Sequence, residues 1–200
     1  MDNKAMYSLS YGLFVLTAYE YKHNGCIINT AMQVTTTPNR ISITVNKQNL
    51  THDMIKSTGV FNISVLSESV PFDIFKSFGF VSGRNSDKFD GIDCVDYSKN
   101  GLIYLTKYAN AYISGKVINT VDLGTHTMFI ADVTDCAVLS DEKSVTYDYY
   151  HKNIKPKADN REKKKGYRCK ICGYIHEGDE RPDDFVCPIC KHGAADFERI

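Results

Sequence analysis

Residues 169–190 read CKICGYIHEGDERPDDFVCPIC, and this stretch places four cysteines in two pairs, Cys169 with Cys172 and Cys187 with Cys190. A two-residue spacer lets both thiolates of a pair face one ion, and two such pairs complete a tetrahedral site. The spacing therefore predicts a small module whose fold is organised around four metal ligands. Structural zinc and a single redox-active iron both use this ligand set, and the spacing alone does not choose between them.

The overall composition limits the functions that this chain performs. Its 200 residues are 42% hydrophobic and 24% charged, with a formal net charge of zero, which is ordinary for a soluble globular protein and argues against nucleic-acid binding. No stretch approaches a membrane-spanning helix, and the first residues lack a signal-peptide pattern. The other cysteines, Cys26, Cys94 and Cys136, stand singly among apolar or strand-like neighbours, which favours buried thiols over a disulfide framework. We therefore expect a cytoplasmic protein with no membrane and no nucleic-acid partner.

Charge along the chain is uneven and indicates a linker. Residues 152–165 carry 7 basic and 2 acidic residues, include Pro156, and contain Ile154 as their one large apolar residue. A polar segment of this kind is typical of a tether between folded parts. We expect a large domain over residues 1–151, a basic linker over 152–165, and the metal module over 166–200.

The large domain reads mainly as β-strands. Several stretches are rich in β-branched and aromatic residues, and only two short stretches read as helices. Asn24-Gly25 is typical of the tip of a hairpin turn. Many strands with few short helices predict a closed or partly closed antiparallel barrel, and no GxGxxG motif supports a Rossmann nucleotide site. The expected strands are 11–19, 26–36, 41–45, 60–66, 102–105, 111–121 and 127–139, and the expected helices are 49–57 and 71–78.

Residues 34–52 combine the parts of an anion site. The segment holds the hydroxyls of Thr35, Thr36 and Thr37, the side-chain amides of Asn46 and Asn49, and the cation Lys47. Thr51 lies near an expected helix start, where unpaired N–H groups attract a phosphate. Threonine is also common in ordinary strands, and Asn49 or Thr51 is equally typical of a simple helix cap. If the metal is a one-electron iron, a flavin is the natural converter of hydride pairs from a nicotinamide.

The cysteine motifs resemble rubredoxin, the electron-transfer module with one iron bound by four cysteines. The resemblance rests on Tyr167-x-Cys-x-x-Cys-Gly-Tyr174 and on Pro182-Asp-Asp-Phe-x-Cys-Pro-x-Cys190. Only 14 residues separate Cys172 from Cys187, which is more similar to the truncated rubredoxin domains of larger redox proteins. The resemblance implies iron bound by Cys169, Cys172, Cys187 and Cys190, and a zinc ribbon remains the alternative.

The order of motifs in the large domain resembles the FMN-binding split-barrel flavin reductases, especially the flavoredoxin-like branch. The resemblance rests on Asn24-Gly25, Asn29-Thr30, Gln33 to Thr36, Val45 to His52, Phe78 to Arg84 with Asp87-Lys-Phe89, and Gly124 to Ile130. It implies a mainly β fold, an FMN-binding split β-barrel with short helices, and a homodimer that binds FMN across its interface. It places Asn46, Lys47, Asn49 and Thr51 at the phosphate, Gln33, Val34 and Thr35 at the flavin ring, Asn29, Thr36, Ser82 and Arg84 close to the cofactor, and His126 as the catalytic candidate near the nicotinamide.

The two parts together resemble the high-molecular-weight rubredoxins. That resemblance implies an electron-transfer oxidoreductase in which NAD(P)H reduces FMN, FMN reduces the iron centre, and the iron reduces an acceptor protein. The implied acceptor is a flavodiiron protein that reduces oxygen or nitric oxide. Two other interpretations stay open: a flavin reductase with a zinc-stapled docking tail, and a flavin-dependent reductase of a small molecule that receives electrons through the tail.

Overall fold

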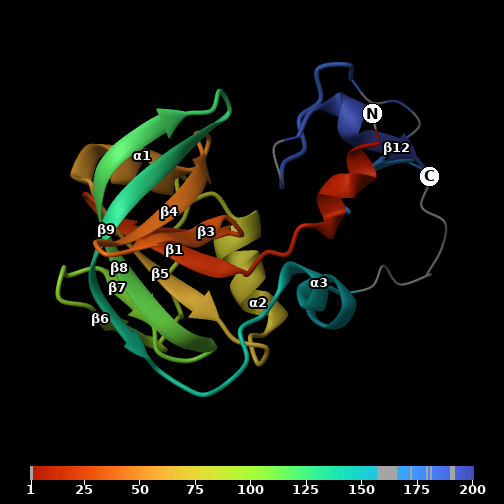
Figure 1. Ribbon diagram of the computed structural model, residues 1–200. Coiled ribbons are helices and arrows are strands. Elements are labelled where there is room, and N and C mark those ends of the chain that lie inside the picture. Colours follow the sequence, from red (N-terminus) through yellow and green to blue (C-terminus); the bar gives the residue numbers. More distant parts are fainter. Residues whose placement is uncertain (1, 157–165, 172, 179, 181, 190–191) are drawn as a thin grey trace. The chain divides into compact units, whose positions relative to one another are not determined.

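The computed structural model describes residues 2–156, 166–171, 173–178, 180, 182–189 and 192–200. The chain divides into two compact units, Met1–Lys155 and Pro156–Ile200 (Figure 1). None of the helices in the described parts of the chain has the length and apolar character that a membrane crossing needs.

A seven-stranded antiparallel sheet in the order β2-β1-β5-β8-β9-β4-β3 forms the first unit. The outermost strands, β2 and β3, are consecutive in the chain and are joined by Asn29 and Thr30 alone. A two-residue connection between opposite edges requires the sheet to roll up until these edges meet, so the sheet forms a split barrel (Figure 1). The predicted mainly β fold is confirmed. The strands are β1 Phe14–Tyr19, β2 His23–Ile28, β3 Ala31–Thr36, β4 Asn39–Asn46, β5 Val60–Leu66, β8 Ala109–Asp122 and β9 His126–Val138.

Short helices and one small ribbon complete the first unit. The longest helix is α1, Leu50–Thr58, which packs against β1 and β2 and buries Met54 and Ile55. It ends at Gly59, whose φ of 72° is a left-handed conformation that glycine adopts without strain. The other elements are η1 Asn3–Ser8, α2 Phe72–Phe75, η2 Lys76–Phe80, β6 Val95–Tyr97, β7 Ile103–Leu105, α3 Tyr147–Tyr149 and η3 Tyr150–Ile154.

Both faces of β1 are buried, which gives this unit two apolar clusters. Leu16 and Ala18 point into the barrel, where they join Phe61 and Phe129. Val15 points to the opposite face and joins a second cluster beneath α2 and η2, which includes Phe75 and Phe78. Successive residues of a strand face opposite sides of a sheet, so one strand supplies both clusters.

The hairpin prediction at Asn24-Gly25 was wrong. Residues 20–22 make the turn, and both Asn24 and Gly25 lie inside β2, where they pair with Ala18 and Thr17. A Cβ atom at position 25 would lie 3.0 Å from both the Leu16 carbonyl oxygen and the Phe78 ring, so close packing explains this glycine. The strand expected over residues 26–36 is likewise two strands, because the chain passes from one sheet edge to the other at residues 29–30.

The first unit continues beyond residue 151. Residues 150–154 form η3, and Ile154 packs against the second cluster. Ile154 was the one large apolar residue in the expected linker, and its packing against this cluster, where it is partly buried, holds the start of that segment on the domain. The rest of the expected linker, residues 157–165, lies outside the described residues.

The second unit is a small sheet in the order β11-β10-β12. Its core contains Cys169, Cys187 and Phe197, with four partly buried aromatic or aliphatic side chains packed around them. Its elements are β10 Gly166–Cys169, β11 Ile175–Glu177, η4 Ala194–Asp196 and β12 Phe197–Arg199.

Candidate functional site

The turn between β4 and α1 holds the predicted phosphate residues. Lys47 N donates to the Thr125 carbonyl at 3.0 Å, and Asn49 N donates to the Asn46 carbonyl at 3.0 Å, so the backbone of this turn is fixed. The side chain of Asn49, the N-cap residue, makes no capping hydrogen bond in the described structure. The Asn49 side chain therefore does not cap the first-turn N–H groups of α1, and these groups and the positive end of the helix dipole point toward the turn between β4 and α1.

Lys47 already has a carboxylate partner. Its Nζ lies 2.7 Å from Oδ1 of Asp122, at the end of β8. The hydrogen bond from Lys47, together with the one from Gly124 N, lowers the pKa of Asp122. A bound anion at this turn must therefore compete with Asp122 for the ammonium group.

Arg84 reaches the first turn of α1 from the far end of a loop. Its Nη2 lies 2.6 Å from Oδ2 of Asp53, and Oδ1 of Asp53 lies 3.1 Å from Nδ1 of His52. His52 Nε2 lies 2.9 Å from Thr127 Oγ1, so the chain of contacts continues to β9. Burial opposes the ionisation of Asp53, but the hydrogen bonds from His52 and Arg84 outweigh it and lower the pKa of this carboxyl group.

Thr51 is placed differently from a surface phosphate ligand. Its side chain is fully buried, and its Oγ1 accepts a hydrogen bond from Nδ2 of Asn24 at 2.9 Å. Asn24 Oδ1 is buried and has no partner within the described residues. A Cβ atom at Gly83 would lie 2.0 Å from this oxygen, so the loop of Arg84 presses directly on the strand of Asn24.

His126 and Ser82 complete the group at this end of the barrel. His126 opposes Asn46 in the β4–β9 ladder, and its Nδ1 lies 2.8 Å from Thr125 Oγ1. Ser82 lies two residues before Arg84 and accepts a 3.3 Å hydrogen bond from the Arg84 backbone N–H through its Oγ. The structure thus brings three segments that are distant in the sequence, residues 46–51, 82–84 and 122–127, to the region where α1 begins.

The remaining predicted flavin residues lie on β3, at the edge of the sheet. Gln33 Nε2 donates to Asn39 Oδ1 at 2.9 Å, and Thr35 Oγ1 donates to the Pro38 carbonyl at 2.5 Å. The ladder shifts register between Gln33 and Thr35, so Val34 forms a bulge that alters the direction of the neighbouring side chains. Asn29 lies just before β3, and Thr36 pairs with Asn39 at its end.

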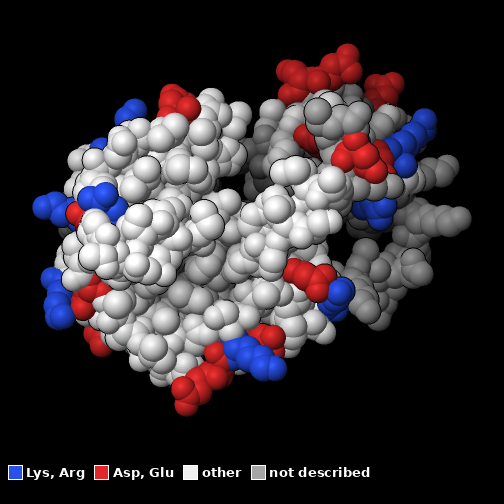
Figure 2. All heavy atoms as spheres, in the orientation of Figure 1, with Lys and Arg blue, Asp and Glu red and all other residues white. Residues whose placement is uncertain are grey.

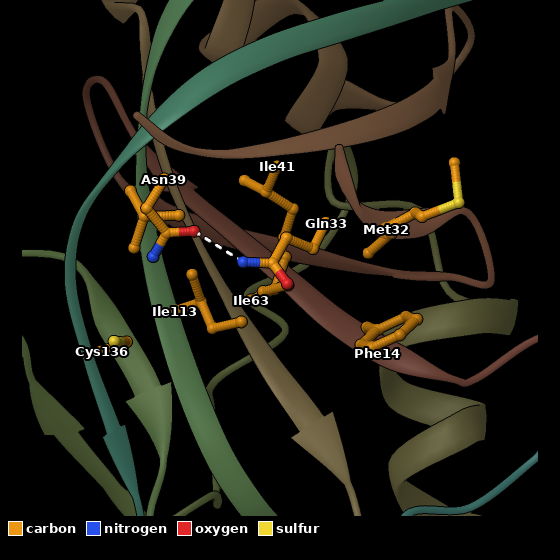
Figure 3. A pocket seen from close by; sticks show the side chains of 10 residues that line it. Phe14, Met32, Gln33, Asn39, Ile41, Ile63, Ile113 and Cys136 are labelled. Carbon is orange, nitrogen blue, oxygen red and sulfur yellow. Dashed lines mark hydrogen bonds between the residues drawn. The ribbon is translucent and has the colours of Figure 1, made fainter. Parts of the chain in front are cut away.

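A hollow of about 310 Å³ opens beside the Gln33–Asn39 pair (Figure 3). Gln33 and Asn39 lie at its rim, while Phe14, Ile63 and Ile113 supply apolar walls from β1, β5 and β8. The hollow is the mouth of the barrel at its open end.

The predicted cofactor residues therefore form two groups along the barrel. Gln33 pairs with Ile41 of β4. The turn that holds the predicted phosphate residues, called the phosphate turn below (residues 46–51), begins at Asn46, five residues further along the same strand. Five residues of extended strand correspond to about 17 Å. This spacing suits an elongated ligand with an anion at one end and a planar ring at the other.

The chemistry of the turn fits the phosphate of a flavin mononucleotide. Lys47 and Arg84 supply two cations, the first turn of α1 supplies backbone N–H groups, and Asn46 and Asn49 supply amides. Thr51 contributes its backbone N–H and anchors α1 with its buried side chain. An anion with several oxygens is what this donor set binds best.

The two cysteine loops of the second unit share one backbone hydrogen bond, at the first cysteine of each. Cys169 N donates to the carbonyl five residues ahead, at Tyr174, and Cys187 N donates to that of His192, both at 2.8 Å. Gly173 N closes the first loop onto the Cys169 carbonyl at 2.9 Å, with φ of 80°. Such paired loops are typical of four-thiolate metal sites.

The described residues supply two of the four predicted ligands. Cys169 and Cys187 are 1% and 0% exposed and pack with Phe197. Phe185 and Tyr174 lie around them. The other two predicted ligands, Cys172 and Cys190, lie outside the described residues. The environment of the described pair is dry and apolar, which fits thiolates that bind a metal ion rather than solvent.

Four residues of this region were not predicted from the sequence. Asp122 and Asp53 neutralise the two cations, and Lys22 and Lys88 hold the loop of Arg84. The two ion pairs and the bonds of Lys22 to Gly83 and of Lys88 to Gly25 join residues at least 31 positions apart, so no local sequence signal indicated them.

Comparison with known proteins gives two family matches. Residues 6–157 match the model of the flavin reductase like domain, and residues 167–198 match the rubredoxin-like domain of rubrerythrin. The order of the two matches agrees with the two units of the structure.

Relatives agree with this assignment. The chain is 40% identical to the high molecular weight rubredoxin of Moorella thermoacetica, with 100% of both chains covered. It is 38% identical to the ferric-chelate reductase (NAD(P)H) of Archaeoglobus fulgidus, over 76% of this chain and 89% of that one. The NADH:FAD oxidoreductase of Streptomyces globisporus C-1027 shares the fold, with a TM-score of 0.66 at 19% identity over 72% of this chain and 84% of that one. The chain therefore belongs to the high molecular weight rubredoxins, with an oxidoreductase domain of the NAD(P)H-dependent flavin reductase type followed by a rubredoxin-like domain.

Proposed function

We propose that this chain passes electrons from NAD(P)H through FMN to one iron ion bound by the four cysteines of the second unit, and from there to a protein acceptor. The observation that carries the proposal is that Lys47 lies in the turn before α1 and Arg84 reaches Asp53 in the first turn of this helix, in a chain that also holds the paired cysteine loops. Bound FMN would accept a hydride from the nicotinamide and release its electrons singly.

At the phosphate end, the chain binds and orients the cofactor. Lys47 and Arg84 exchange their carboxylate partners for phosphate oxygens, and the N–H groups of α1 donate to the remaining oxygens. Ser82 supports the loop of Arg84 through its hydrogen bond to the backbone. One terminal phosphate satisfies this donor set, which favours FMN over riboflavin.

At the ring end, β3 supplies the edge of the flavin site. Gln33, Val34, Thr35 and Thr36 lie on this exposed strand, with Asn29 just before it. His126 is also proposed as the catalytic residue near the nicotinamide, as the resemblance to the flavin reductases implies, and the β4–β9 ladder places it opposite Asn46, at the phosphate end of the site.

The metal is proposed to be iron. The aromatic shell of Phe197, Tyr174 and Phe185 around buried Cys169 and Cys187 limits solvent access, which is one of the factors that set the potential of an iron–thiolate centre. Iron bound by four thiolates carries one electron, which matches single-electron delivery from a flavin.

The acceptor is proposed to be a flavodiiron protein with a basic docking face. Acidic side chains gather on one side of the second unit (Figure 2), and Glu177, Glu180, Asp183 and Asp184 are all exposed. An acidic surface near a redox centre steers a partner of opposite charge and raises the association rate.

The first unit is proposed to form a homodimer through the β3 face. Met32 and Val34 are 65% and 42% exposed there, and the hollow at the barrel mouth is apolar. Figure 2 shows few charged side chains on the visible face of this unit, around its centre. Apolar exposure of this kind is typical of a surface that a partner covers.

A visible absorption spectrum with metal analysis on the same sample tests the proposal. We expect flavin bands, a red chromophore that bleaches on addition of NADH, and one iron per chain. Flavin bands with zinc and no red chromophore would instead make the second unit a docking module on a flavin reductase.

A further inference from the structure

Lys88 is a buried lysine outside the group of predicted cofactor residues. The residue is only 7% exposed, and its Nζ donates to the carbonyls of Gly25 at 2.9 Å and Phe78 at 3.1 Å. Burial lowers the pKa of Lys88, and the nearby Cys26 partly offsets this. A buried lysine is rare, and an apolar side chain of similar size would avoid the loss of hydration. The two hydrogen bonds therefore point to a role in positioning.

These bonds tie the segment of residues 78–88, which carries Arg84, to β2. Gly25 belongs to β2, whereas Phe78 belongs to η2, at the start of the segment that leads to Arg84. Lys22 adds a third tie, because its Nζ donates to the Gly83 carbonyl at 2.6 Å. This segment thus lies against the β1–β2 hairpin at its two ends, Phe78 and Lys88, and near its middle, at Gly83.

The tied segment carries Ser82 and Arg84. Within the described chain, the hydrogen bonds of residues 82–86 are local, apart from the bond from Lys22 and the Arg84–Asp53 pair. The position of the Arg84 guanidinium at α1 therefore depends on the contacts that hold the two ends of this segment.

We propose that Lys88 is a positioning residue that holds this loop so that Arg84 lies at the phosphate of the flavin. Lys88 acts through the loop and contacts no cofactor itself. The inference rests on the proposed phosphate site at the start of α1. Lys22 assists at the middle of the loop.

The test compares FMN with riboflavin, which lacks the phosphate, in Lys88→Met. If Lys88 positions Arg84, the dissociation constant of FMN rises about tenfold, and that of riboflavin stays unchanged. The matched control is Lys76→Met, which also removes one positive charge but from an exposed lysine paired with Asp73. This control leaves both constants unchanged.

Equal weakening of FMN and riboflavin would reduce Lys88 to a structural residue, and unchanged FMN binding would remove it from the site altogether. If Lys88→Met does not fold, Lys22→Met decides by the same comparison, because Lys22 is only partly buried. A wild-type protein that binds FMN no more tightly than riboflavin would instead overturn the phosphate site itself.

Discussion

Replacement of Cys187 by serine should unfold the second unit and leave the first intact. The core of the second unit contains Cys169, Cys187 and Phe197. Burial of Phe197 contributes on the order of 3 kcal/mol at most, and each of the four partly buried side chains around it contributes less, whereas a four-thiolate metal site contributes on the order of 10 kcal/mol to folding. A metal ion at the proposed site would therefore be the largest single source of stability, and loss of the fully buried Cys187 would remove it.

Hydrogen exchange measured by mass spectrometry and steady-state kinetics together check this prediction. In Cys187→Ser, residues 166–200 should lose protection and the protein should lose its metal. NAD(P)H-driven flavin reduction should stay within about twofold of the wild type, because the two units have separate cores. Electron delivery to an acceptor protein should disappear. Pro188→Ala is the control, since it changes the same loop without removing a ligand.

Two results would refute this reasoning. Retained protection of residues 166–200 without metal would show that side-chain packing alone holds the second unit. Loss of flavin reduction together with the metal would show that the two units do not function separately.

Three further changes test the first unit. Lys47→Ala should weaken FMN binding about tenfold by fluorescence titration, whereas Asp122→Asn should tighten it by freeing the ammonium group. His126→Gln should lower kcat/KM for NAD(P)H about tenfold with an unchanged FMN dissociation constant. The pKa of Asp53 is lower in the folded state, because hydrogen bonds from its histidine and arginine partners outweigh burial. Its stabilising effect is therefore present above an unfolded pKa of about 4 and is lost as pH falls through the folded value, so melting temperatures of Asp53→Asn should depend less on pH in that acidic range.

Each of these results has an outcome that contradicts it. Unchanged FMN affinity in Lys47→Ala would place the phosphate elsewhere. A proportional loss of FMN affinity in His126→Gln would make the histidine a cofactor ligand rather than a residue that positions the nicotinamide. Equal acid sensitivity of Asp53→Asn and wild type would show that the Asp53 contacts do not stabilise the fold.

Local patterns identified elements whose geometry depends on near neighbours. The cysteine loops close through hydrogen bonds between residues five positions apart, so their spacing is visible in the sequence. Helix α1 spans Leu50–Thr58, within one residue at each end of the helix expected over residues 49–57. The predicted phosphate residues from Asn46 to Thr51 were likewise visible as a group, because they are nearly consecutive in the chain.

The error at Asn24-Gly25 shows where local patterns fail. This dipeptide is a common hairpin turn, but here Asn24 bonds to Thr51 and Gly25 packs under Phe78. Both residues are used for contacts with α1 and η2 rather than for backbone reversal. Propensity is a weak preference that close packing between distant segments overrides.

The sequence by itself determined the strand-rich first domain, the start and end of α1, the four candidate metal ligands and the resemblance to a flavin reductase joined to a rubredoxin. Only the tertiary structure decided that Asp53 pairs with Arg84 and Asp122 with Lys47, and that Lys88 is buried. The physical reason is that spacing and periodicity report interactions within a few residues. Ion pairs and the burial of a charged group depend on which distant segments the folded barrel brings together.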